Sequence, residues 1–184
     1  SLGMGGGNRI RCFVIGGDSL LVECAEILRQ RGHEILGVIS SAPRIVQWAT
    51  AKELRCVGAT SAYVDILKSE PFDYLFAITH LSILPDEALA LPRKGAVNFH
   101  DGPLPSYAGL NAPVWALLNQ ESEYGITWHL MTQAVDAGEI LKQRLFAISS
   151  DETALSLNTK CFEAGIESFG ELVDELSAGT VSRT

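Results

Sequence analysis

The chain has 184 residues, which is enough for one compact α/β domain and too few for two of ordinary size. Its formal net charge of −8, without any cluster of Lys and Arg, argues against nucleic acid as a partner, because phosphate backbones are bound by clustered basic side chains. No apolar run approaches the roughly 18–20 residues that span a bilayer and no signal-peptide pattern opens the chain, so we expect no membrane partner.

We expect residues 1–7 to be a tag or linker and residues 8–184 to form a single domain, because no repeat, low-complexity run or linker divides the rest. The cysteines are scattered, without the close pairs of zinc or redox motifs. Most lie in apolar surroundings, where a reduced thiol acts as a small hydrophobe. A reducing, cytoplasmic location is therefore predicted. The cysteines are Cys12, Cys24, Cys56 and Cys161.

The first half of the chain alternates short apolar runs with amphipathic stretches, which is typical of βα units on a parallel sheet. A buried strand is predicted over residues 10–15, followed by a Gly-Gly turn at 16–19 and a helix over 20–31. The next predicted elements are a strand at 34–40, a helix at 44–54, a short strand at 55–57, a helix at 62–68 and a strand at 74–78.

The second half continues with a short helix at 85–90, a strand at 96–100, a helix at 112–119, strands at 124–130 and 140–147 and a long helix at 153–176. The loop at 101–110 holds two prolines and two glycines, so we expect it to be irregular but stiff. Trp115 and Trp128 are expected to be core aromatics. The predicted fold is α/β: one doubly wound, mostly parallel, Rossmann-like sheet with helices on both faces.

Ligands of such sheets bind beyond the carboxyl ends of the strands, which directs attention to the loops after the first, fourth and fifth strands. Gly16 and Gly17 could hold an anion at the start of the following helix. The full G-x-G-x-x-G pattern is absent, however, and a tight strand-to-helix turn explains two glycines equally well. Both interpretations stay open at this point.

The fifth strand carries Asn98 and His100, which share a face because they are two residues apart. Buried polar side chains cost about 1–3 kcal/mol each when unpaired, so an amide beside an imidazole indicates a site. Alternatively, His100 only ties the following loop to the sheet. Asp136, in a turn-like segment between two later strands, could orient His100 and support proton transfer, or it could simply be a turn residue.

Three motifs in this order resemble the folate-dependent formyltransferase family, which includes the methionyl-tRNA, glycinamide-ribonucleotide and sugar-amine formyltransferases. The motifs are Asn98-x-His100 with a Pro-containing loop that ends at Gly109, the run at 125–129, and Asp136-x-Gly138, which begins 36 residues after the histidine. The resemblance extends from about residue 10 to residue 176 and is strongest over 74–141.

The resemblance implies that Asn98, His100 and Asp136 are catalytic and that the formyl donor is 10-formyltetrahydrofolate. An amine would attack the formyl carbon, Asn98 and protonated His100 would stabilise the oxyanion, and Asp136 would hold the imidazolium and relay a proton. No metal is implied. His129 matches a family position as well, and we expect a structural role for it.

The same resemblance places the pterin between residues 81–84 and a loop at 131–136. Ile83 and Leu84 would be apolar walls, although a core contact at a helix start would also explain them. The cofactor-binding residues implied in this way are Leu81, Ser82, Ile83, Leu84, Met131 and Val135.

The chain departs from the family pattern at the acceptor side. Gly102-Pro103-Leu104-Pro105 replaces the usual Ser-Leu-Leu-Pro, which stiffens the loop. Asn111 stands where the glycinamide-ribonucleotide branch has His, which argues against the purine substrate. We therefore expect Gly16, Gly17 and Asn111 to contact some other acceptor amine.

Three classes of acceptor remain: an aminoacyl group tethered to a carrier protein in a larger synthetase, a nucleotide-linked amino sugar, and a free small amine. The first two are preferred because the chain resembles a piece of something larger. Rival hypotheses are an inactive folate- or nucleotide-binding module and a 10-formyltetrahydrofolate hydrolase.

Overall fold

The computed structural model describes residues 7–60, 62–132 and 138–184. Its elements follow the predicted order, and most boundaries differ by one or two residues, the usual scatter at element ends. The strands are β1 (Arg11–Ile15), β2 (Glu34–Ile39), β3 (Cys56–Val57), β4 (Tyr74–Ala77), β5 (Gly95–His100), β6 (Glu123–Leu130) and β7 (Ile140–Ala147). The helices are α1 (Ser19–Gln30), α2 (Pro43–Ala51), α3 (Tyr63–Leu67), α4 (Asp86–Ala90), α5 (Ala112–Leu118) and α6 (Ala154–Ala178).

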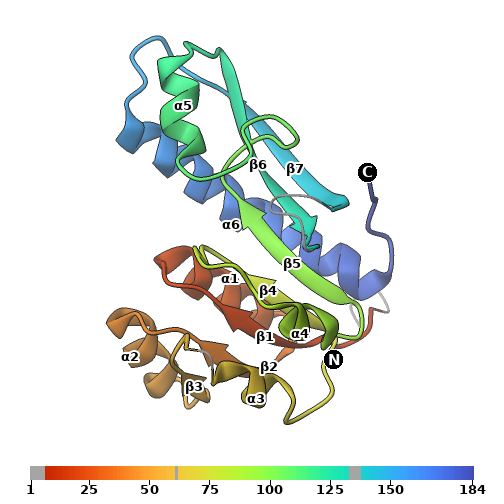
Figure 1. Cartoon of the computed structure of the whole chain (residues 1–184). Helices are drawn as coiled ribbons and strands as arrows, with labels where there is room; N and C mark the ends of the chain where they lie inside the picture. Colours follow the sequence, from red (N-terminus) through yellow and green to blue (C-terminus); the bar gives the residue numbers. More distant parts are fainter. Residues whose placement is uncertain (1–6, 61, 133–137) are drawn as a thin grey trace.

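The strands form one seven-stranded sheet in the order β3-β2-β1-β4-β5-β6-β7 (Figure 1). β1 to β5 are parallel, whereas β6 is antiparallel to both β5 and β7. The chain starts in the middle, winds outward to β3 and then returns to β4 on the other side of β1. This reversal confirms the predicted doubly wound sheet and puts a switch point between β1 and β4.

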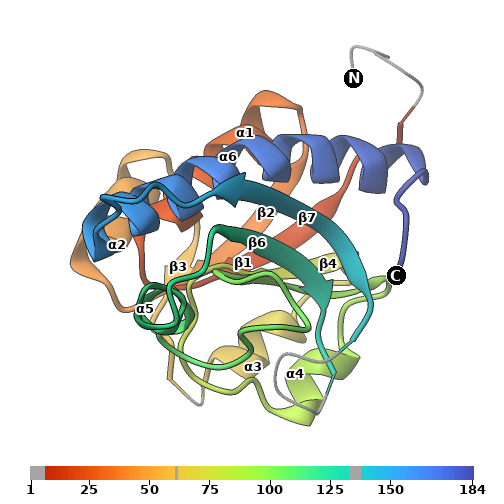
Figure 2. The same cartoon turned by 90° about the horizontal axis from the view of Figure 1, so that it is seen from above.

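Helices cover both faces of the sheet, as predicted (Figure 2). The long helix α6 lies beside α1 over one face, and α3 and α4 lie over the other. Helix α6 begins at a capping box in which Thr153 and Ser156 bond each other's backbone N–H groups, and it ends at Gly179 in the left-handed conformation. These end signals explain why the longest helix closes the sheet where the sequence pattern predicts.

Two apolar cores lie against the two faces. The larger one contains Trp128, whose indole N–H donates to the Ser168 hydroxyl at 2.9 Å. Trp128 is therefore the core aromatic that the sequence predicts. The same prediction is wrong for Trp115, which is 57% exposed on α5. Helix α5 buries its small residues Ala112 and Ala116 instead, because close packing there leaves no room for an indole.

The four cysteines are free thiols, and burial raises the pKa of the Cys24 thiol. None of the described helices combines the length and apolar character that a membrane crossing requires.

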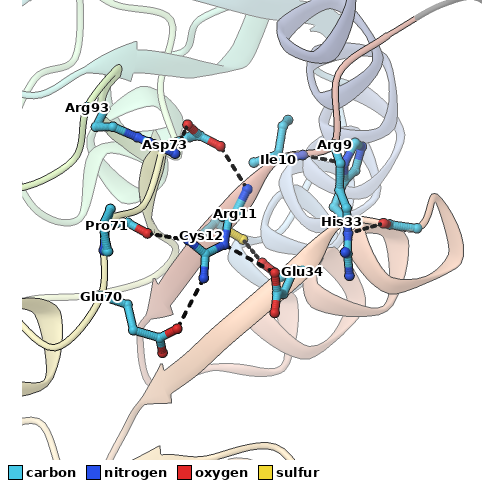
Figure 3. Close-up of polar contacts among 11 residues, drawn as sticks. Arg9, Ile10, Arg11, Cys12, His33, Glu34, Glu70, Pro71, Asp73 and Arg93 are labelled. Atoms are coloured by element: carbon cyan, nitrogen blue, oxygen red, sulfur yellow. Dashed lines mark hydrogen bonds and ion pairs between the residues drawn. The ribbon is translucent and has the colours of Figure 1, made fainter. Parts of the chain in front are cut away.

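A polar cluster ties the amino ends of β1 and β2 to the segment that leads into β4 (Figure 3). The Arg11 guanidinium lies 3.2 Å from the Glu34 carboxylate and 3.1 Å from that of Glu70. The Arg11 backbone N–H donates to Asp73 at 2.9 Å, and Arg93 donates to the same carboxylate at 3.0 Å. Half-exposed ion pairs contribute about 0–1 kcal/mol each. These charges therefore align strands at the amino edge, away from the edge where ligands bind.

At the carboxyl edge, Gly16 allows the end of β1 to approach the chain that leaves β4. A Cβ on Gly16 would lie 1.7 Å from the carbonyl oxygen of Ile78, whereas the nearest atom to a Cβ on Gly17 is the Thr79 carbonyl oxygen at 4.0 Å. The Gly17 N–H donates to that oxygen at 3.3 Å. Close approach of two backbones thus explains Gly16, while the space at Gly17 is open.

We predict that Gly16→Ala lowers the free energy of unfolding by about 1–3 kcal/mol, because backbone atoms at the switch point must move to admit the methyl group. Gly17→Ala is the matched control and should change it by less than about 0.5 kcal/mol. Urea denaturation of the two variants measures both values. Equal effects at the two positions would contradict this account of the turn.

Candidate functional site

The turns after β1, β4 and β5 line one cavity of about 810 Å³ at the carboxyl edge of the sheet. This is the place that the switch point predicts for a ligand. The cavity brings together residues that the sequence analysis assigned to three different roles. They are Gly16, Gly17, Leu81, Ser82, Ile83, Leu84, Asn98, His100, Asn111 and Met131. Val135 and Asp136 lie outside the described residues, so their roles stay predictions.

Asn98 and His100 point to the same side of β5, as expected. Ala96 packs in the core beneath α3 and α4, and alternation along the strand turns Asn98 and His100 to that face as well. Phe99 points to the opposite face, where its ring centroid lies 5.0 Å from that of Trp128. The two polar side chains therefore meet the cavity, and Phe99 between them packs its partly buried ring against the core.

His129 holds the Asn98 side chain across the antiparallel β5–β6 pair. Its Nε2 lies 3.1 Å from Asn98 Nδ2, and its Nδ1 lies 3.1 Å from the carbonyl oxygen of Leu130. A carbonyl oxygen only accepts, so His129 Nδ1 carries a proton and Nε2 accepts from the amide. His129 is only 2% exposed. The structural role expected for it is therefore a specific one: it orients the Asn98 amide.

The His100 imidazole is buried and anchored to the following loop. Its Nε2 donates to the backbone oxygen of Tyr107 at 2.6 Å. A Cβ on Gly102 would lie 2.9 Å from that Nε2 and 3.0 Å from the Tyr107 oxygen. The missing side chain at Gly102 thus makes room for the ring. Sequence reasoning noted this residue only as a departure from the family pattern.

The loop at 101–110 is anchored independently of His100. The buried Thr127 hydroxyl accepts from the Leu104 N–H at 3.1 Å and donates to the Gly102 carbonyl at 2.7 Å. Gln143 Nε2 donates to the Leu104 oxygen at 2.9 Å. A buried, satisfied network of this kind rigidifies the segment it holds. The loop is irregular, as expected, and His100 is one of several residues that tie it to the sheet.

The segment after β4 combines a core residue with exposed apolar side chains on the cavity. Leu84 is 3% exposed and packs with α4, whereas Leu81 and Ile83 are each 80% exposed. Leu84 therefore makes the core contact that was considered for both residues, whereas Ile83 does not. Burial lowers the pKa of the nearby His80 imidazole, which also lines the cavity. Met131 enters from the end of β6, where its N–H donates to the Ala96 oxygen at 2.8 Å.

The acceptor side of the cavity contains Asn111 and the turn at the start of α1. Asn111 has a φ of 59°, in the left-handed region that Asn tolerates well, and it begins α5. At α1, the Asp18 carboxylate accepts from the Leu20 N–H at 3.4 Å and caps the helix. The turn that could hold an anion thus already holds a carboxylate.

Among the residues that the structure describes, no three His, Cys, Asp or Glu side chains are grouped to hold a metal ion.

A family model described as formyl transferase matches residues 8–173. Among curated relatives, a methionyl-tRNA formyltransferase of Caldanaerobacter subterraneus is 28% identical over 92% of this chain and 60% of its own length. A second, from Geobacter sulfurreducens, is 35% identical over 67% of this chain and 39% of its own length. The chain thus spans about 60% or less of the length of these relatives.

Solved structures of low identity share the fold. A phosphoribosylglycinamide formyltransferase of Anaplasma phagocytophilum superposes with a TM-score of 0.84 at 23% identity, over 94% of this chain and 89% of its own. The sugar 3N-formyl transferase WlaRD, crystallised in the presence of dTDP and 5-N-formyl-THF, gives 0.80 at 21% identity, over 97% of this chain and 66% of its own.

We predict that Gly102→Ala displaces the His100 ring, because the new methyl group would contact Nε2 and the Tyr107 oxygen. The hydrogen bond at Nε2 should be lost, with a destabilisation of about 1–3 kcal/mol. Nitrogen-15 NMR of the imidazole reports the bond directly. Gly17→Ala, a glycine with open space on the same cavity, is the control. An unchanged His100 spectrum in Gly102→Ala would contradict the steric argument.

We also predict that His129→Ala frees the Asn98 amide, while His129→Gln, whose side-chain oxygen can accept, partly restrains it. The side-chain amide protons of Asn98 should exchange with water at least tenfold faster in the alanine variant, because a buried hydrogen bond is lost. Hydrogen-exchange NMR measures this rate. Equal exchange in the wild type and both variants would show that His129 does not orient the amide.

Proposed function

The chain belongs to the formyl transferase family, and on this premise we propose that it transfers a formyl group from a formyl-tetrahydrofolate donor to a primary amine. The observation that carries the proposal is the placement of Asn98 and His100 on one face of β5 in a cavity of about 810 Å³. Each of the two side chains is held by a hydrogen bond to a fixed neighbour.

The donor we propose is 10-formyltetrahydrofolate, which supplies a formyl carbon open to attack by an amine. The cavity volume lies within the usual range for small-molecule sites, about 300–1,000 Å³. Leu84 and Met131 offer apolar wall, and Leu81 and Ile83 expose apolar surface that a flat ring would cover. Val135 is proposed to join them, from the family pattern.

Asn98 is proposed to stabilise negative charge on the formyl oxygen. Its Nδ2 carries two N–H groups, and His129 engages one of them. The other N–H can donate to an oxyanion, a contribution of about 3–4 kcal/mol for a well-placed donor. Because His129 fixes the amide in advance, little reorganisation is needed when charge develops.

When the amine has attacked the formyl carbon, the bond from that carbon to the folate nitrogen breaks and the nitrogen leaves with a proton. His100 is proposed to move this proton from the attacking amine to the folate nitrogen. The neutral ring carries its proton on Nε2, which donates to Tyr107, so Nδ1 is the atom at which the ring takes up a second proton. Asp136, two residues before Gly138, is proposed to pair with that imidazolium, as in the family motif. Burial of His100 keeps water from competing for this proton.

The acceptor is proposed to be an amine on a small molecule or on a carrier protein within a larger synthetase. Gly16, Gly17 and Asn111 are proposed to contact it from the side of the cavity formed by α1 and α5. The curated relatives are named for methionyl-tRNA, but the net charge of −8 and the lack of a basic cluster favour a partner other than nucleic acid. A cytoplasmic location remains a prediction.

We predict that the chain forms N-formyl product from 10-formyltetrahydrofolate and a panel of primary amines, detected by mass spectrometry. Asn98→Ala and His100→Ala should each lower kcat/KM by about 10²–10³-fold, and Asp136→Asn by about 10²-fold or more. Calorimetric affinity for a stable donor analogue should change little, which separates binding from chemistry. His33→Ala is the control histidine, because His33 lies at the amino edge of the sheet and bonds the Ile10 N–H.

The outcomes separate the rival hypotheses. Formate release without any acceptor would favour a hydrolase. Binding of the analogue without turnover would favour an inactive folate-binding module. Nucleotide affinity without folate affinity would overturn the folate site and favour a nucleotide-binding module.

A further inference from the structure

Apart from the histidines His80, His100 and His129, the ionisable side chains that line the described part of the cavity are all acidic: Asp18, Asp86 and Asp101. None of the 14 Lys and Arg side chains, all of which lie in the described ranges, is part of this lining. A cavity of this composition has a negative potential.

Asp18 has a particular effect because of its place at the start of α1. The N-terminus of a helix attracts anions through its exposed N–H groups and its dipole. Here the Asp18 carboxylate accepts the Leu20 N–H, so the anion position is taken by the chain's own charge. A phosphate at this turn would meet a carboxylate in place of unpaired N–H groups.

The rim of the cavity is apolar. Leu110 is 69% exposed and Val114 is 44% exposed, and both line the cavity from the segment that leads into α5. Leu81 and Ile83, which are proposed to cover the donor, lie on the separate segment after β4. Exposed apolar side chains gathered at a cavity mark a surface that an apolar ligand covers.

We infer that the acceptor is a cationic amine with an apolar substituent and with no phosphate inside the cavity, an aminoacyl group in preference to a phosphorylated amine or a nucleotide-linked sugar. This inference rests on the formyl transfer proposed above. The carboxylates attract the ammonium form of the amine and repel phosphate, and the rim covers the apolar substituent. The ammonium form releases one proton to water before the neutral amine attacks, and the negative surroundings hold the ammonium in place until then.

Two matched pairs of probes test the two halves of the inference. Serinamide and O-phosphoserinamide differ only in the phosphate, and glycinamide and leucinamide differ only in the apolar side chain. Each is titrated by calorimetry into the full chain, with and without a saturating donor analogue. Serinamide should bind at least tenfold more tightly than its phosphate ester, and leucinamide at least tenfold more tightly than glycinamide.

Charge variants test whether the carboxylates of the cavity cause the preference for serinamide over its phosphate ester. In Asp18→Asn/Asp86→Asn the preference against phosphate should fall at least threefold, and the asparagine introduced at position 18 keeps a side-chain oxygen to cap α1. Asp65→Asn/Glu163→Gln changes the net charge equally at exposed positions outside the cavity and should leave the ratio unchanged. Leu110→Ser should lower the preference for leucinamide, whereas Leu155→Ser, at a residue 78% exposed on α6, should not.

Equal or tighter binding of O-phosphoserinamide, or no gain from the leucine side chain, overturns the inference. A failure to detect binding of any probe does so as well. Formylation of the phosphorylated probe at the higher rate would overturn the inference and leave the proposed function intact. Conversely, the expected binding ratios without any formyl product would overturn the proposed function while the cavity's preference stands.

Discussion

The hydrogen bond between Asn98 and His129 is the interaction on which the geometry of the site depends, and it exists because β5 has unlike neighbours. On one side, parallel β4 ends at Ala77, which is level with Asn98, so the chain leaves the sheet there and opens the cavity. On the other side, antiparallel β6 sets His129 directly opposite Asn98. A parallel strand in the place of β6 would end at the carboxyl edge of the sheet, as β4 does. A loop would then lie where the His129 imidazole lies now. The change from parallel to antiparallel pairing therefore provides both the space for a ligand and the support for the amide.

Local sequence patterns were sufficient to predict the elements of this fold. Short apolar runs mark the strands, amphipathic stretches mark the helices, and Gly16 and Gly17 mark the turn that follows the first strand. The same patterns predicted that Asn98 and His100 share a face. They could not predict the contact with His129, because register across an antiparallel pair depends on residues 31 positions apart. The place of Asp136 beside His100 likewise remains a prediction.

Trp115 shows a second limit of predicting structure from sequence patterns, which is the orientation of a helix. A large aromatic residue on an apolar helix is expected to point inward, since its burial removes the largest area from water. Helix α5 instead packs Ala112 and Ala116 against the core and exposes Trp115 and Leu118. Close approach of two helices favours small residues at the contact, and this requirement outweighs the gain from burying the indole. The exposed Trp115 and Leu118 lie on the same helix as Val114, which lines the cavity.

The departure of the loop from the family pattern and the position of His100 are parts of one arrangement. The family commonly has Ser where this chain has Gly102, and any Cβ at that position would lie 2.9 Å from His100 Nε2. In this chain the ring lies against the Tyr107 oxygen, while Thr127 and Gln143 keep Gly102 and Leu104 in place. The buried network holds the loop, and the loop holds Nε2 through the Tyr107 oxygen, so Nδ1 is the nitrogen that is proposed to carry the proton chemistry. The glycine at position 102 is therefore part of the arrangement that selects the nitrogen of His100 proposed to act.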